Sequence, residues 1–300
     1  MEQTDRQPAS PEARHPVRVA VVVLVGVTAI LGLKLGVFAI TGSTAVLSDA
    51  LESLVNITAA VLALFSVWYA SRPADREHPY GHGKIEFVTA GVEGLLLLAA
   101  AAAIAVRAVG RLMHGGQIAS IGTGMVALLG IAVLLGALAW YGLRQGRRLH
   151  SAALVADSRH LLVDVATTVG VAGALAVVKW TGWMWVDPAA AAALCVLVGW
   201  TAVGLLGRSL GGLLDRIDEA DDAAIRSILD HEVAAGRIES YEKVRHRHQG
   251  AYHWVDMHLR FPPGMSVEQA HDRASRIEGK VERELGQANA TAHIEPEKDA

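Results

Sequence analysis

The chain has 300 residues, of which 52% are apolar, and its mean hydropathy is positive at +0.33. This composition is too apolar for a typical soluble domain and indicates a membrane protein. The formal net charge of −3 indicates neither a nucleic-acid surface nor a strongly acidic partner. Because Cys195 is the only cysteine, a disulfide within the chain and a zinc–thiolate cluster are both excluded.

The first two thirds of the chain predict six transmembrane helices. Residues 1–16 are polar and contain three prolines, so we expect a disordered cytoplasmic tail rather than a cleaved signal. Arginine and lysine gather before the first apolar run, between the second and third, and between the fourth and fifth, which predicts that both termini are cytoplasmic. The runs that are long enough to cross a bilayer occupy roughly 17–41, 44–70, 87–110, 119–142, 152–179 and 183–207.

The chain changes character after Gly211 and Gly212, where most of its charge begins. Helix and strand signals follow in the order helix, strand, strand, helix, strand, which predicts a small α+β domain. The expected elements are Asp218–Ala235, 244–247, 251–261, 266–285 and 290–295. The predicted organisation is therefore a tail at 1–16, an all-α six-helix transmembrane domain at 17–208 and a cytoplasmic domain at 209–300.

Two polar stripes interrupt the apolar runs. In a helix, positions i, i+3 and i+7 share one face. This spacing is found in Asp157, His160 and Asp164, and again in Asp49, Glu52 and Asn56. Carboxylates with an imidazole suit Zn²⁺, Fe²⁺, Co²⁺ or Mn²⁺ better than Mg²⁺ or Ca²⁺. The plainer alternative for Asp157 or Asp49 is that it caps a helix, pairs with Arg159, or lines the ion pathway without binding the ion.

A second candidate metal site lies in the polar segment between the second and third runs. Asp75, His78 and His82 form an Asp-x2-His-x3-His array with the spacing of metal ligands. The alternative is a polar loop whose histidines face water. Pro79 and two glycines indicate a shaped backbone, which favours the metal site.

Together these features resemble the cation diffusion facilitator (cation efflux) family over about residues 17 to 296. The resemblance rests on the six spans, the stretch Ser48-Asp49-Ala50-Leu51-Glu52-Ser53, the loop His78-Pro79-Tyr80-Gly81-His82-Gly83-Lys84 and the Asp157–Asp164 stretch. It implies a homodimeric, Y-shaped transporter that exports divalent transition-metal ions, most commonly zinc, in exchange for protons. It also implies a metallochaperone-like αββαβ cytoplasmic domain.

By this resemblance, the transport site consists of Glu52, Asn56, His160 and Asp164. Family members usually have Asp or His at the position of Glu52 and Asp at that of Asn56. Because Asn56 is neutral, the site has two carboxylates instead of three, which predicts weaker affinity or altered metal choice.

The resemblance assigns further residues outside the membrane. Asp75, His78 and His82 carry over as the loop metal site, and Lys84 and Asp215 as an interlock that holds the dimer, although Lys84 also suits ordinary cytoplasmic positive charge. The metal centre of the cytoplasmic domain carries over to Glu242, His258, His271, His293 and Glu295. His246, His248 and His253 have no family counterpart, and we expect them to be solvated.

The predicted function is proton-coupled export of divalent metal cations by alternating access. The expected partners are the metal ions, protons, the lipid bilayer of a bacterial inner membrane and a second copy of the chain, with no nucleic acid, no obligatory cofactor and no enzymatic activity. One alternative is a metal-sensing membrane protein without transport. Another is a membrane-embedded metallohydrolase, but His231-Glu232 begins a His-Glu-x2-His pattern that no second histidine completes.

Overall fold

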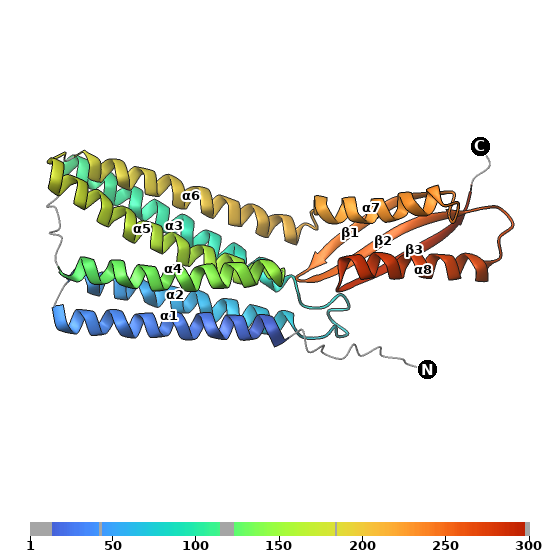
Figure 1. Ribbon diagram of the computed structural model, residues 1–300, viewed down its shortest axis with the longest axis horizontal. Coiled ribbons are helices and arrows are strands. Elements are labelled where there is room, and N and C mark those ends of the chain that lie inside the picture. The colour runs from blue at the N-terminus through green and yellow to red at the C-terminus, as the bar shows by residue number, and fades with distance from the viewer. Residues whose placement is uncertain (1–13, 42–43, 115–122, 184, 298–300) are drawn as a thin grey trace.

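The computed structural model describes residues 14–41, 44–114, 123–183 and 185–297. Within these ranges the structure does not describe every side chain, and those of Asp49 and Glu52 are among the ones left out. An elongated helical domain is followed end to end by a small domain that contains the sheet (Figure 1). The predicted all-α domain and the α+β domain after it are both confirmed.

Six helices form the first domain. They are α1 (Arg14–Thr41), α2 (Thr44–Ala70), α3 (Ile85–His114), α4 (Thr123–Arg148), α5 (Ala152–Thr181) and α6 (Val186–Leu213). Within the described residues, length and apolar composition mark four stretches that can cross a membrane, and α2 has a shorter apolar stretch, Asn56–Ala70. The four longer stretches are Pro16–Ile40, Ile85–Val106, Ala152–Val178 and Ala189–Leu213.

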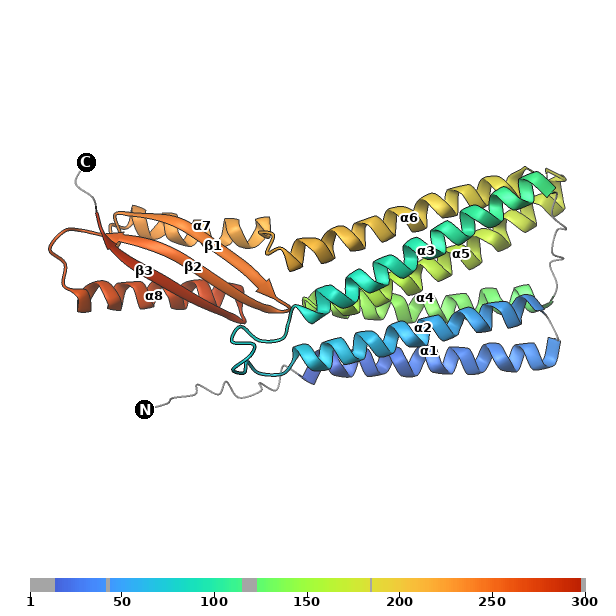
Figure 2. The same cartoon turned by 180° about the vertical axis from the view of Figure 1, so that it is seen from behind.

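The six helices lie in two groups, α1 with α2 and α4, and α3 with α5 and α6. The groups converge towards the C-terminal domain and diverge at the opposite end (Figure 2). Leu161 of α5 belongs to a buried cluster with α1, α2 and α4, whereas Val163 belongs to a cluster with α3 and α6. Helix α5 therefore packs against both groups, and its polar stripe lies in the interior of the bundle.

The second domain has the predicted order α7 (Glu219–Ala234), β1 (Ser240–Gln249), β2 (Tyr252–Phe261), α8 (Val267–Leu285) and β3 (Ala288–Pro296). The sheet order is β1-β2-β3, with β1 antiparallel and β3 parallel to β2. The side chain of Asp218 accepts hydrogen bonds from the first-turn amides of α7, and Ser266 caps α8 in the same way. Both caps lie where the sequence predicts that these helices begin.

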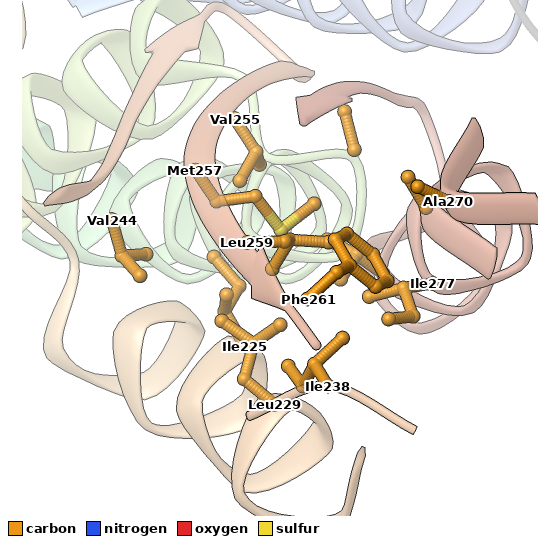
Figure 3. Packing of buried hydrophobic residues seen from close by; sticks show 13 residues of the cluster. Ile225, Leu229, Ile238, Val244, Val255, Met257, Leu259, Phe261, Ala270 and Ile277 are labelled. Atoms are coloured by element: carbon orange, nitrogen blue, oxygen red, sulfur yellow. The ribbon is translucent and has the colours of Figure 1, made fainter. Parts of the chain in front are cut away.

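One face of the sheet packs against α7 and α8 to form the core of this domain. Val255, Met257, Leu259 and Phe261 alternate along β2 and point into this core, where they meet Ile277 of α8 (Figure 3). Strand β1 begins four residues before its predicted start at Val244. The reason is a register shift between Glu242 and Arg245, next to Lys243 at φ +50°, which breaks the alternation that a sequence pattern can detect.

Candidate metal sites

The polar stripes of α2 and α5 meet inside the bundle. The amide nitrogen Nδ2 of Asn56 donates a hydrogen bond of 2.6 Å to Oδ2 of Asp164. His160 lies one turn before Asp164 on α5 and is buried, as is Asn56. Within the described ranges, Nδ1 of His160 has no hydrogen-bond partner. A carboxylate, an amide and an unpaired imidazole nitrogen thus come together from two helices.

Glu52 and Asp49 belong to the same helix as Asn56, but their side chains lie outside the described part of the chain. Because they precede Asn56 by four and seven positions, helical periodicity places all three on one face of α2. Their roles as ligand and pathway residue remain predictions.

A second buried carboxylate lies beside Asp157, and the sequence analysis missed it. Glu93 of α3 is 0% exposed and Asp157 of α5 is 1% exposed. In the part of the chain that the structure describes, both carboxylate oxygens of Glu93 lack a hydrogen-bond partner, and so does Oδ1 of Asp157. The two carboxylates repel each other, and Asp157 also repels Asp164. Burial of such a group costs free energy unless it takes up a proton or meets a cation. The signal was present in the sequence as a lone carboxylate in the apolar run 87–110.

The sequence analysis also did not identify Lys34 as a buried lysine. Nζ of Lys34 on α1 donates a hydrogen bond of 2.7 Å to the hydroxyl of Ser53 on α2, and both side chains are buried. Ser53 is the neighbour of the predicted ligand Glu52. Lys34 therefore brings a basic side chain next to the polar stripe of α2, and its signal in the sequence is a lysine in the middle of the first apolar run.

The predicted loop site is assembled between α2 and α3. Oδ1 of Asp75 accepts hydrogen bonds from the backbone amides of His78 (2.7 Å) and Glu77 (2.9 Å), while Oδ2 lies 3.2 Å from Nε2 of His82. The His78 amide is the main cause that lowers the pKa of Asp75 below its ordinary value, with the Glu77 amide adding to it. The ligand atoms of Asp75, His78 and His82 all lie within 4.8 Å of one another. The three residues that the sequence predicts thus form one compact group.

This loop packs against the C-terminal domain. The ring of Tyr80 lies edge-on to Trp254, and the guanidinium of Arg247 lies 4.2 Å from the centre of the Tyr80 ring. Nζ of Lys84 lies 2.9 Å from Oδ1 of Asp215, so the two predicted interlock residues form an ion pair within one protomer. Each side chain is about a third exposed, so this pair alone contributes little to stability.

The structure brings together three of the five residues predicted for the metal centre of the C-terminal domain. His258 on β2 lies 2.9 Å from Glu295 on β3, and His293 completes a group whose ligand atoms lie within 4.8 Å of one another. Glu242 pairs with Arg260 at 3.0 Å. His271 is exposed on α8 and does not join the group within the protomer.

The expectation that His246, His248 and His253 are solvated is wrong. His246 and His253 are each 6% exposed, and Nε2 of His248 lies 3.0 Å from Oδ2 of Asp221. Their positions on β1 and β2 face the core side of the sheet, under α7. The sequence already contained this signal, because His253 has the same parity along its strand as Val255 and Met257.

Comparison with protein families covers nearly the whole chain. The cation efflux transmembrane domain matches residues 19–214, and the cytoplasmic domain of cation efflux proteins matches residues 217–297. The chain belongs to the cation efflux family. Its members are transporters and not enzymes, so the metallohydrolase alternative is wrong. The protein is an integral membrane protein of a family that exports metal cations.

Individual relatives agree with this assignment. An uncharacterized transporter of Synechocystis sp. is 38% identical over 273 residues, which cover 90% of this chain and 87% of the relative. The cation-efflux pump FieF of Klebsiella pneumoniae is 26% identical over 279 residues, or 93% of this chain and 92% of the pump. A solved structure from a study of the mode of action of CzrB is 24% identical. It has a TM-score of 0.26 and covers 27% of this chain and 99% of its own.

Proposed function

We propose that the protein exports divalent transition-metal ions, with zinc as the leading substrate, in exchange for protons by alternating access. The observation that carries the proposal is the hydrogen bond between Asn56 and Asp164 beside the unpaired ring nitrogen of His160, in the interior of the bundle. The family resemblance assigned these three residues to one site. Their mixed oxygen and nitrogen donors suit zinc-type ions better than Mg²⁺ or Ca²⁺.

Proton exchange follows from the chemistry of these ligands. A metal ion binds imidazole and carboxylate only after they lose their protons, so metal and protons compete for one site. In the inward-facing state the ion displaces protons, and in the outward-facing state protons displace the ion. The buried carboxylates of Glu93 and Asp157 are suited to carry protons next to the site, since within the described residues no hydrogen-bond partner meets either oxygen of Glu93 or Oδ1 of Asp157.

We further propose that the C-terminal domain and both termini lie in the cytoplasm, in a bacterial inner membrane, and that the protein is a homodimer. In this arrangement Asp75, His78 and His82 face the cytoplasm near the entrance to the bundle. The group of His258, His293 and Glu295 lies at the dimer interface, and Lys84 with Asp215 contributes to the interlock. The excess of arginine and lysine in the loops on that side supports this orientation.

Transport in proteoliposomes tests the proposal. Wild-type protein is expected to move Zn²⁺ across the membrane with opposite movement of protons, each followed by its own dye. His160→Ala and Asp164→Ala are expected to lose both fluxes, and His231→Ala, an exposed change on α7, is the control. If both site variants transport like wild type, the proposed site is wrong.

A cellular measurement separates transport from metal sensing. Cells that express the wild type are expected to accumulate less zinc than cells that express Glu52→Ala. Equal accumulation, with both proteins present in the membrane, would support a sensor without transport.

A further inference from the structure

Three histidines lie on the face of the sheet that packs against α7 and α8. They occupy positions where apolar side chains of the core would be expected. His246 and His248 lie two positions apart on β1, and His253 on β2 is paired with His248 across the ladder. His253 continues the alternation of Val255, Met257 and Leu259, all of which are buried (Figure 3). These histidines therefore lie at core positions, at the end of the sheet nearest the β1–β2 turn.

Carboxylates from the first turn of α7 face these rings. Oδ2 of Asp221 lies 3.0 Å from Nε2 of His248 and 3.3 Å from Nδ1 of His253. Oδ1 of Asp222 lies 3.8 Å from Nε2 of His246. The ligand atoms of Asp221, His248 and His253 all lie within 4.8 Å of one another.

These short distances are not hydrogen bonds. Nε2 of His246, Nε2 of His248 and Nδ1 of His253 are buried and have no hydrogen-bond partner among the residues described. A buried polar atom without a partner costs free energy. Unpartnered nitrogens this close to a carboxylate oxygen are the arrangement that ligands adopt around an ion.

Burial also favours the neutral form of two of these histidines. Burial is the main cause that lowers the pKa of His253 to about 4, and the neighbouring His248 adds to this effect. Burial likewise lowers the pKa of His246. A neutral imidazole can donate a lone pair to a metal ion.

We propose that Asp221, His248 and His253 form a binding site for a zinc-type divalent ion at the junction between the two domains. The site is separate from the transport site, from the Asp75 loop group and from the His258 group. Ligands at about 2.0–2.1 Å from a tetrahedral zinc lie about 3.3 Å from one another, which agrees with the two contacts of Asp221. Two imidazoles with one carboxylate select zinc-type ions over Mg²⁺, which prefers oxygen ligands.

A cavity of about 680 Å³ between the domains extends to the edge of the site. Its lining includes His150 and Ser151 before α5, Asp218 before α7, and His248 with Gly250 in the C-terminal domain. An ion from solution can therefore reach His248 without passing through the bundle.

An ion bound at this site would link α7 to the β1–β2 turn. Asp221 belongs to α7, whereas His248 and His253 flank the β1–β2 turn. That turn packs so closely against the α2–α3 loop that a Cβ atom at Gly83 would overlap the backbone of Gln249 and Gly250. A bound ion would fasten α7 to the turn that supports the loop, and so stiffen the contact between the membrane domain and the C-terminal domain.

Zinc counting on the full-length protein tests the site without relying on transport. The chelator-stripped protein is dialysed against Zn²⁺ alone, Mg²⁺ alone or both ions at the same concentration, and bound metal is counted. The His248→Gln/His253→Gln variant is expected to bind one zinc ion per protomer fewer than wild type. His231→Gln, an exposed histidine on α7, is expected to bind the wild-type number. Equal zinc counts in the double variant and wild type would overturn the proposal, as would competition by Mg²⁺ at the same concentration.

A measurement on the wild-type protein guards against misfolding of the variant. Crystals of the full chain grown with Zn²⁺ are expected to give a zinc anomalous peak about 2.0–2.1 Å from Nε2 of His248 and Nδ1 of His253. A peak at the His258 group with none between Asp221 and His248 would exclude the site even if the variant were unstable. Both experiments measure metal bound at this site and not transport. The site can therefore be absent although the protein exports metal, and it can be present although the protein does not.

Discussion

The amide of Asn56 presents its nitrogen, and not its carbonyl oxygen, to the carboxylate of Asp164, at 2.6 Å. An amide nitrogen cannot bind a metal cation, so Asn56 must rotate its amide to become a ligand, or else it orients Asp164 without binding the ion. In either case an Asp164 oxygen that an incoming ion needs is engaged with a neighbour. The entering metal must displace this hydrogen bond.

This relationship predicts the effect of Asn56→Asp. The substitution places a second carboxylate against Asp164, and two carboxylates at this distance share a proton until a cation separates them. At pH 8 we expect the KM for zinc to fall about tenfold, equivalent to about 1.4 kcal/mol. At pH 6 the advantage should shrink because the added carboxylate binds protons. Zinc uptake by proteoliposomes at the two pH values measures both effects.

Asn289→Asp on β3 is the matched control, since it makes the same chemical change outside the bundle. An unchanged KM at both pH values in Asn56→Asp would mean that Asn56 does not contact the ion.

Glu93→Gln tests whether the buried carboxylate of α3 carries protons. The amide keeps the shape of the side chain but cannot take up and release a proton, so fewer protons should move for each zinc ion while zinc transport persists. Asp157→Asn should have a similar effect because it removes the facing carboxylate. Simultaneous recording of zinc and proton fluxes gives the ratio. Glu239→Gln in the C-terminal domain is the control, and an unchanged ratio in Glu93→Gln would remove Glu93 from the proton path.

The sequence predicts the elements of this protein well because apolar runs and caps are local signals. No knowledge of which elements touch is needed to predict the six apolar runs, the caps Asp218 and Ser266, and the order of elements in the α+β domain. The bulge at Lys243 was missed because a positive φ and a register shift produce no periodic pattern in the sequence.

Prediction of the sites was less complete, for a different physical reason. Asp75, His78 and His82 are close in the chain, and their spacing alone predicts the group that the structure contains. Glu93 and Lys34 belong to no sequence motif, so their relevance depends on which helix they face. The histidines of the β1–β2 hairpin need Asp221, which precedes His248 by 27 positions, and only the packing of α7 on the sheet brings them together.

The loop site predicts a capture step that Asp75→Asn can isolate. An Asn side-chain oxygen can still accept the hydrogen bonds from the amides of Glu77 and His78, so the turn should be preserved while the charge beside His82 is lost. We expect the KM for zinc to rise by about tenfold, a typical cost of disturbing a metal site, with kcat unchanged. Initial rates over a range of zinc concentrations measure the two constants. Glu77→Gln removes a charge from the same loop, and an equal effect there would indicate general electrostatic attraction instead of a site.

Glu232 predicts the acid stability of the C-terminal domain. This side chain of α7 is 1% exposed and accepts hydrogen bonds from Arg237 and Lys280. The hydrogen bond from Arg237, followed by that from Lys280, lowers the pKa of Glu232 from 4.5 to about 2. A carboxyl group whose pKa is lower in the folded state stabilises the fold above its unfolded pKa, and this stabilisation is lost as the pH falls towards the folded pKa.

The contribution of Glu232 should therefore be complete at neutral pH, decline below about pH 4.5 and vanish near pH 2. Glu232→Gln is expected to lower the free energy of unfolding by about 2–3 kcal/mol at pH 7 and by much less near pH 3, because the amide cannot form the charged pair. Chemical denaturation of the full chain measures the difference, followed by the fluorescence of a protein in which Trp254 is kept as the only one of the seven tryptophans. Glu284→Gln, an exposed change on α8, controls for the loss of one negative charge. Equal losses of stability in the two variants, or a loss in Glu232→Gln that does not depend on pH, would show that the pairing with Arg237 and Lys280 does not set the stability of this domain.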